Sequence, residues 1–143
     1  MLFRSPETYD TKAMTDAFRQ ICRDRDTGKK CEYKWPAYDR TIHDPVPDQY
    51  AITGDILLVE GNYLLLEETP WRELREYADE TIFVDASEEM LKDRLVNRKI
   101  RGGSTAEAAE EWFAHTDAYN IERVLHGSVK ADCQIRAEAD GPQ

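Results

Sequence analysis

The stretch GDILLVEGNYLLLEETPW, residues 54–71, decides the fold class. Residues 56–59 form a continuous apolar run, which is typical of a parallel strand buried on both faces. The run ends at Glu60, and Gly61 then permits a tight turn before Asn62. Because ligands bind beyond the carboxyl ends of parallel strands, Glu60 is a candidate to hold Mg²⁺ or to orient a reacting hydroxyl. An ordinary solvated strand end is an equally good interpretation.

The segments around this stretch alternate between helical and strand patterns. Apolar residues at helical spacing predict helices at residues 11–24, 70–78, 88–100 and 104–126. The expected N-caps are Asp10 or Thr11, Thr69, Ser87 and Ser104. Three further segments read as strands, at residues 31–35, 81–85 and 131–136, and the proline-containing segment 37–54 reads as a loop. This order predicts an α/β fold with a parallel sheet and right-handed crossovers.

Length, charge and cysteine content narrow the class of protein. The 143 residues suit one domain, and the formal net charge of −10 disfavours a general nucleic-acid or anionic-membrane surface. No apolar run approaches the length of a membrane-spanning helix. The three cysteines lack a C-x-x-C spacing, which favours reduced thiols in a cytoplasmic protein. The three histidines form no metal-binding pattern, so we expect no metal site made of side chains alone.

A row of arginines stands out in this acidic chain. Arg94, Arg98 and Arg101 recur at i, i+4 and i+7, so one face of the helix carries all three. Lys99 adds to the local positive charge, and Gly102 with its glycine neighbour follows at once. Planar guanidinium groups suit phosphate oxygens, and a glycine pair lets a segment close over a ligand. We therefore favour an anion-binding row over a solvated face that receives glutamates from another element.

Two other groups of residues are candidates for binding a substrate. The segment WPAYDRTIHDP, residues 35–45, places Tyr38 where it could stack on a ring and Asp39 where it could bind hydroxyls. A packed loop with a surface ion pair explains the same residues. Asp117 and Asn120 share one face of the last helix, at i and i+3, but capping or solvent roles explain them equally well.

These pieces occur together in a known pattern. The matching stretches are PETYD at 6–10, PAYDR at 36–40, LLVEGNYLL at 57–65, TIFVDASEEMLKDRLVNRKIRGG at 81–103, DAYNIERV at 117–124 and ADCQI at 131–135. On these residues the chain resembles the uridine kinase/phosphoribulokinase group of P-loop kinases, which includes bacterial pantothenate kinase. The resemblance spans nearly the whole chain in the expected order, and the ordered set is more specific than any one stretch.

The resemblance implies a reaction and a set of roles. Such kinases use Mg²⁺ and transfer the γ-phosphoryl group of ATP to a hydroxyl of a small metabolite, here a nucleoside, a sugar or a pantothenate-like compound. Glu60 would lie near the metal, and the arginine row would form a lid that neutralises the transferring phosphoryl group. Arg98 and the strand near Asp132 would lie close to the nucleotide. The residues facing the acceptor would be Tyr38, Asp39, Arg40, Asn62, Asp117 and Asn120.

The chain departs from this group in one respect. It contains no G-x-x-x-x-G-K-S/T, the motif whose backbone amides and lysine cradle phosphates. Residues 1–5, MLFRS, can be encoded by codons that match the end of a common sequencing adapter, so we expect a non-native leader there. Residues 6–143 would then be the C-terminal two-thirds of a single α/β kinase-like domain, lacking the Walker A strand and loop and inactive alone.

A second interpretation remains open. The chain could be a natural non-catalytic module that binds a phosphorylated ligand or a partner protein without a phosphate loop. The genomic segment upstream separates the two interpretations, because an in-frame Walker A motif supports the kinase and a clean start codon supports the binding module. The acceptor, the general base and the oligomeric state, with a homodimer as one option, are left open by the sequence.

Overall fold

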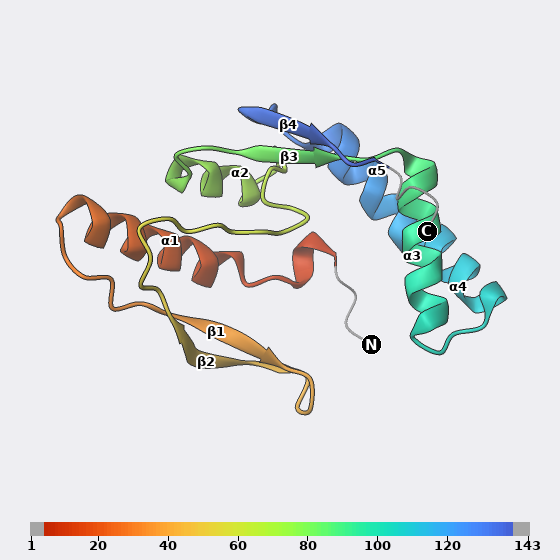
Figure 1. Ribbon diagram of the computed structural model, residues 1–143, viewed down its shortest axis with the longest axis horizontal. Helices are drawn as coiled ribbons and strands as arrows, with labels where there is room; N and C mark the ends of the chain where they lie inside the picture. Colours follow the sequence, from red (N-terminus) through yellow and green to blue (C-terminus); the bar gives the residue numbers. More distant parts are fainter. Residues whose placement is uncertain (1–4, 139–143) are drawn as a thin grey trace. The chain divides into compact units, whose positions relative to one another are not determined.

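The computed structural model describes residues 5–138, in two compact units. The smaller unit is Asp10–Gly61, and the other described residues form the larger unit. The helices are α1 (Thr11–Asp26), α2 (Trp71–Leu74), α3 (Glu88–Arg101), α4 (Ala106–Trp112) and α5 (Ala118–Gly127) (Figure 1). The strands are β1 (Lys34–Asp39), β2 (Asp44–Ala51), β3 (Ile82–Asp85) and β4 (Cys133–Arg136). No helix within residues 5–138 combines the length and apolarity needed to cross a membrane. Most of the expected leader, residues 1–4, lies outside the described residues.

The smaller unit begins with the predicted helix. The Asp10 carboxylate accepts a hydrogen bond of 2.9 Å from the Ala13 N–H, which confirms Asp10 as the N-cap of α1. Phe18 on α1 is buried, and its ring stacks on Trp35 of β1 with 5.8 Å between ring centres. This aromatic pair packs α1 against the start of β1.

The expected loop at residues 37–54 is wrong. Strands β1 and β2 pair there as an antiparallel hairpin, with Trp35 opposite Tyr50 and Tyr38 opposite Pro45. The prolines that argued for a loop are compatible with this hairpin, because a two-stranded sheet has edge positions where a strand needs no N–H donor. Pro36, which directly precedes this segment, lies at the register shift between Trp35 and Ala37.

The buried strand expected at residues 56–59 is also wrong. This segment is irregular, and Ile56 and Leu58 are 90% and 84% exposed. A buried strand needs neighbouring strands for its backbone groups and a covering layer for its side chains. Within residues 5–138, no strand pairs with this segment. Glu60 at its end is exposed as well.

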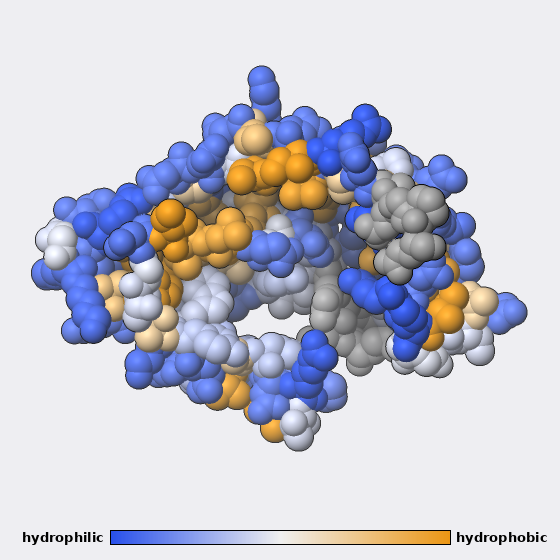
Figure 2. Space-filling model, in the orientation of Figure 1, coloured by the Kyte–Doolittle hydropathy of each residue, from blue (hydrophilic) through white to orange (hydrophobic). Residues whose placement is uncertain are grey.

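The larger unit contains the parallel strand pair that the sequence predicted. Ile82 lies opposite Cys133 and Asp85 lies opposite Arg136, so β3 and β4 run side by side in register. The pair is fastened at its start, where the backbone N–H and the hydroxyl of Thr81 both donate to Asp132 Oδ2, at 2.9 and 2.5 Å. Val84 and Ile135, which face each other across the pair, are 66% and 50% exposed. Figure 2 shows the resulting apolar patch over β3 and β4.

Buried core residues of the larger unit come from the segment that follows Asn62 and from α2. Tyr63, Leu66, Trp71 and Leu74 are each at most 4% exposed. The segment around Leu66 is held by an antiparallel bridge to Ser128. An ion-pair cluster joins the same region to α5, because Arg123 reaches both Glu7 and Glu68 at 2.6 Å.

Several details of the predicted helices need correction. Ser87 caps α3 as expected, accepting from Met90 N at 3.3 Å. Pro70 is the N-cap of α2, not Thr69, and the helix expected at residues 70–78 gives way to a 3₁₀ turn at Arg75–Tyr77. Thr105, one residue beyond Ser104, caps α4 by accepting from Ala108 N at 3.2 Å. The single long helix expected after it is interrupted by a π-helix at Phe113–Asp117.

Candidate functional site

The site residues predicted from the sequence are divided between the two units. The smaller unit carries Tyr38, Asp39, Arg40 and Glu60. The larger unit carries Asn62, Arg94, Arg98, Arg101, Asp117, Asn120 and Asp132. Each unit is therefore described by itself. That Glu60 and the arginine row act on the same phosphate group stays a prediction.

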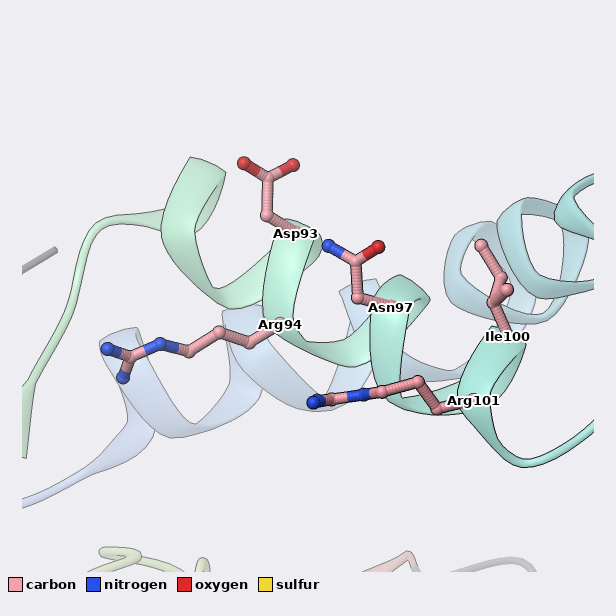
Figure 3. A pocket seen from close by; sticks show the side chains of 5 residues that line it. All are labelled: Asp93, Arg94, Asn97, Ile100 and Arg101. Atoms are coloured by element: carbon pink, nitrogen blue, oxygen red, sulfur yellow. The ribbon is translucent and has the colours of Figure 1, made fainter. Parts of the chain in front are cut away.

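One face of α3 lines a shallow pocket of about 350 Å³. Its lining residues are Asp93, Arg94, Asn97, Ile100 and Arg101. Figure 3 shows the side chains of Arg94 and Arg101, two turns apart, extending to the same side of α3. Arg94 Nη2 also donates to the carbonyl of Glu138 at 3.3 Å, beyond the end of β4. One of the two pocket guanidinium groups thus connects the middle of α3 to the segment after β4.

The charges in this pocket favour a small anion. Arg94 and Arg101 contribute two positive charges, and the carboxylate of Asp93 offsets one of them. Asn97 lies three residues after Arg94 and four before Arg101, and its amide adds a neutral donor to the pocket lining on the side of Asp93 (Figure 3). Sequence reasoning missed Asn97, although an amide between two arginines on one helix face was a usable signal. A group with several oxygens, such as a phosphate, matches this donor set.

Arg98 differs from the other two arginines of the row. It is exposed on α3, and it is absent from the residues that line the pocket. Its charge instead acts on Asp117, where it opposes the rise in pKa that burial causes. The row is therefore split, with Arg94 and Arg101 on the pocket and Arg98 in the field of Asp117.

Asp117 and Asn120 lie at the junction of the π-helix and α5. Burial raises the pKa of the half-buried Asp117 carboxyl, while Arg98, Lys99 and a hydrogen bond with the Trp112 side chain act in the opposite direction. The side-chain oxygen of Asn120 is buried and has no hydrogen-bond partner among the described residues. A π-turn is often found at functional sites, and no local sequence signal had predicted this one.

The hairpin residues proposed for the acceptor surround a turn. Asp39 Oδ1 accepts a hydrogen bond of 2.7 Å from Thr41 N, and this bond keeps the pKa of the Asp39 carboxyl below its ordinary value. Asp39 thus shapes the turn between β1 and β2 and stays ionised. Tyr38 is 51% exposed and Arg40 is exposed, so both can contact a ligand from solvent.

Asp132 and Asn62 occupy different surroundings from each other. The hydrogen bond from the Thr81 hydroxyl lowers the pKa of Asp132, and Arg75 Nη2 lies 3.6 Å from its other carboxylate oxygen. Asp132 therefore fastens β3 to β4 in this structure, and its place near a nucleotide stays a prediction. Asn62 is exposed at the entry to the larger unit.

The sequence predicts one metal ligand, the carboxylate of Glu60. Within residues 5–138, no group of three or more histidine, cysteine, aspartate and glutamate side chains is arranged to hold a metal ion. Glu60 alone fits Mg²⁺ as one ligand, since Mg²⁺ commonly takes one or two carboxylates together with phosphate oxygens and waters.

Comparison with known proteins gives clear relatives. No protein-family model matches the chain. The chain is 40% identical over 137 residues to the uncharacterized protein YggC of Escherichia coli (strain K12), covering 96% of this chain and 55% of that protein. It is 34% identical over 110 residues to the ATP-dependent kinase-like protein notR' of Aspergillus versicolor, covering 74% of this chain and 64% of that protein. The chain thus spans between half and two-thirds of the length of these relatives.

Solved structures identify the fold. A crystal structure described as a fructose transport system kinase from Silicibacter sp. TM1040 matches with a TM-score of 0.73 at 25% identity, over 91% of this chain and 61% of that one. YFH7 of Saccharomyces cerevisiae, described as a P-loop containing kinase with a circular permutation, matches with a TM-score of 0.60 at 26% identity, over 74% of this chain and 35% of that one. The fold class predicted from the sequence, an α/β fold of the P-loop NTPase type, is confirmed by these likenesses.

Proposed function

We propose that the protein is an ATP-dependent kinase that phosphorylates a hydroxyl of a small metabolite. The observation that carries this proposal is the pocket on α3, where Arg94 and Arg101 extend to one side of the helix (Figure 3). The ATP-dependent kinase-like name of the Aspergillus relative and the kinase descriptions of the similar structures support it. Such a kinase would act in the cytoplasm, on a nucleoside, a sugar or a pantothenate-like acceptor.

In this proposal the guanidinium groups of α3 bind the phosphates. Arg94 and Arg101 donate to phosphoryl oxygens, Asn97 adds a neutral donor, and Arg98 contributes charge from the adjacent face. Glu60 supplies one carboxylate oxygen to the metal. ATP with Mg²⁺ provides the phosphoryl group and neutralises charge on its oxygens. Asp132 supports phosphate binding indirectly. It holds the start of the β3–β4 pair in place, and the segment just after β4 accepts a hydrogen bond from Arg94 at Glu138.

Each unit, taken by itself, carries residues that this proposal assigns to the acceptor. Tyr38 offers an exposed ring for stacking, while Asp39 and Arg40 offer charged hydrogen-bonding groups beside it. Asn62, Asp117 and Asn120 supply polar groups from the larger unit. Because carboxylate and amide groups bind hydroxyls well, this set suits a neutral hydroxylated compound.

Titration of the protein with inorganic tripolyphosphate and with Mg·ATP tests the role of the pocket. Arg101→Ala should weaken binding of both probes about tenfold, because it removes a charge-assisted donor. Arg72→Ala is the matched control: Arg72 is equally charged, exposed and distant in sequence, at the start of α2. Equal weakening by the two substitutions would show only a general charge effect and would contradict the proposal.

A non-catalytic module that binds a phosphorylated ligand is the second candidate. It is favoured by one observation, the absence of a G-x-x-x-x-G-K-S/T motif from the 143 residues. The kinase proposal predicts turnover of ATP when the full-length protein is mixed with a panel of nucleosides, sugars and pantothenate. Binding of tripolyphosphate that depends on Arg101, with no turnover for any acceptor, would favour the module instead.

A further inference from the structure

The segment just after β4 extends the parallel strand pair by one hydrogen bond. β3 and β4 pair as far as Asp85 and Arg136, and the Ala137 N–H then donates to the Asp85 carbonyl at 2.7 Å. This bond fixes the course of the chain at the next residue, Glu138. The strand pair therefore sets the position of the Glu138 carbonyl.

Helix α3 starts from the same end of this strand pair. β3 ends at Asp85, the buried Ala86 follows, and Ser87 caps α3. Arg94 lies two turns into α3, and its Nη2 atom donates to the Glu138 carbonyl at 3.3 Å. Because short segments attach both partners of this contact to one strand end, the contact costs little chain entropy.

The contact uses the guanidinium nitrogen that matters most for binding an anion. A guanidinium group can bind two oxygens at once along either of two edges, one formed by Nε and Nη2 and the other by Nη1 and Nη2. Nη2 belongs to both edges. An anion that takes the N–H now facing Glu138 must therefore displace the carbonyl oxygen. Since Arg94 lines the α3 pocket, this exchange would take place at the proposed phosphate site (Figure 3).

We propose that the Glu138 carbonyl is an internal competitor, which occupies Arg94 until an anion binds and is then displaced. The proposal rests on the phosphate-binding role of the α3 pocket and adds a built-in control of its affinity. A phosphoryl oxygen carries more negative charge than a carbonyl oxygen, so it makes the stronger hydrogen bond with a guanidinium group. An anion that also reaches Arg101 gains a further ion pair, which the carbonyl does not offer.

The opposite role for this contact is to hold Arg94 in place for an incoming anion. The two roles predict opposite effects on affinity: loosening the segment after β4 strengthens anion binding if the carbonyl competes, and weakens it if the carbonyl positions Arg94. Arg94 is exposed, and its bond of 3.3 Å to Glu138 is longer than the about 2.7–2.9 Å of a strong charge-assisted hydrogen bond. A bond of this kind holds the guanidinium group weakly, which favours competition.

Ala137→Pro tests the competitor, because proline lacks the N–H that bonds to Asp85. The preceding residue, Arg136, is already in a strand, which is the conformation that proline favours there. Calorimetric titration with inorganic tripolyphosphate should show binding about 3- to 10-fold tighter than in the parent protein. Ala137→Ser keeps the N–H and should bind as the parent does. In an Arg94→Ala background, Ala137→Pro should change nothing, because the competitor then has no partner.

Two further measurements separate the carbonyl from other properties of the segment. Glu138→Gln keeps the carbonyl and removes the side-chain charge, so it should leave the affinity for tripolyphosphate nearly unchanged. Hydrogen exchange on the parent protein needs no variant. Displacement of the Glu138 carbonyl frees the segment beyond the Ala137–Asp85 bond, so the Ala137 amide should exchange at least about twofold faster with saturating tripolyphosphate than without it.

Four outcomes overturn the proposal. Ala137→Pro binds tripolyphosphate no more tightly than the parent, or Glu138→Gln tightens binding as much, or the gain persists in the Arg94→Ala background, or the exchange of the Ala137 amide does not rise. The last of these decides the matter if Ala137→Pro folds poorly. Binding that depends on Arg101 but not on Ala137→Pro refutes the competitor alone, whereas binding that is insensitive to Arg101→Ala contradicts the proposed function.

Discussion

The Nζ atom of Lys99 lies 3.5 Å from the centre of the Trp112 ring, so a cation of α3 rests on an aromatic face at the end of α4. Lys92, two turns earlier on α3, lies 5.8 Å from the Phe113 ring centre and 3.0 Å from a Glu110 carboxylate oxygen. The lysines of α3 therefore pack toward α4, while Arg94 and Arg101 line the pocket. We therefore expect the two lysines to contribute to stability, and Arg94 and Arg101 to contribute to anion binding.

Lys99→Met should destabilise the larger unit. The substitution keeps the length of the side chain but removes the cation over Trp112, at a cost of about 0.5–2 kcal/mol. Lys99→Arg, which keeps a cation over the ring, should lose much less. Urea unfolding measures both, with Lys29→Met at an exposed turn as control. If Lys29→Met lowers the free energy of unfolding as much as Lys99→Met does, the loss of a positive charge explains the effect and the contact with Trp112 does not.

Thr81→Val should loosen the start of the β3–β4 pair. The Thr81 hydroxyl donates to Asp132 Oδ2 at 2.5 Å and accepts from Asp132 N at 3.0 Å, and valine makes neither bond. We expect a loss of about 1–3 kcal/mol in the free energy of unfolding near neutral pH. Thr81→Ser, which keeps the hydroxyl, is the control and should retain most of the stability.

The same variant has a pH signature. Because the Thr81 hydrogen bonds lower the pKa of Asp132 from its ordinary value of 3.8, their contribution is present above that value and is lost as the pH falls through the folded-state pKa. The stability difference between the parent protein and Thr81→Val should therefore narrow in acid. A difference that stays constant from about pH 7 to about pH 3 would show that Asp132 is not the partner that matters.

Arg123→Met should weaken the attachment of α5 to a short 3₁₀ turn at Pro6–Thr8, which contains Glu7. Arg123 is 21% exposed at its side chain and pairs with Glu7 and Glu68, so its removal leaves two carboxylates without their shared partner. We expect a loss of about 1–2 kcal/mol, reduced by solvent at the more exposed glutamates. The loss should shrink as salt is added. Arg72→Met is the control at an exposed site, and equal losses would argue against a special role for Arg123.

Asp117→Asn should stabilise the protein against unfolding at neutral pH. Burial raises the pKa of Asp117 above its ordinary value of 3.8, so the fold favours the protonated form. That contribution is complete below the ordinary value and is lost as the pH rises through the folded-state pKa. Asparagine cannot ionise, so the free energy of unfolding of the variant should rise by less than about 1 kcal/mol near neutral pH and should not rise in strong acid. Melting temperatures across pH measure this, and a gain that persists in acid would contradict it.

Glu60→Gln should lower phosphoryl transfer in the full-length protein about 100-fold, because it removes the proposed carboxylate ligand of Mg²⁺. The concentration of Mg²⁺ required for half-maximal turnover should rise as well. Asp55→Asn changes the same charge five residues earlier, at another exposed position, and should have little effect. Unchanged metal dependence in Glu60→Gln would remove Glu60 from the metal site.

Features set by neighbouring residues could be predicted from the sequence. The caps at Asp10 and Ser87 depend on side chains three residues from the N–H groups that they satisfy, and both are confirmed. The start of α4 was misplaced by one residue, because Ser104 and Thr105 are both good caps and only the backbone decides between them. The β3–β4 pair was also predictable, from two short segments of strand-forming residues.

Features set by distant partners could not be predicted in the same way. The apolar run at residues 56–59 has the composition of a buried strand, but a strand also requires neighbours, which composition does not supply. β2 shows the opposite case. Its prolines are typical of a loop, yet the segment forms a strand because it pairs with β1. The split of the arginine row and the unpaired Asn120 oxygen arise from helix packing and a π-turn, neither of which leaves a periodic signal.

The uncovered side chains of β3 and β4 have a practical consequence for colloidal behaviour. Three apolar side chains on one face of this strand pair are exposed to solvent: Ile82, Val84 and Ile135. Because the protein has a net charge of −10, electrostatic repulsion between molecules opposes association through these faces. Concentrated salt or a buffer close to the isoelectric point would weaken that repulsion and promote precipitation, so dilute, mildly alkaline buffers suit its purification.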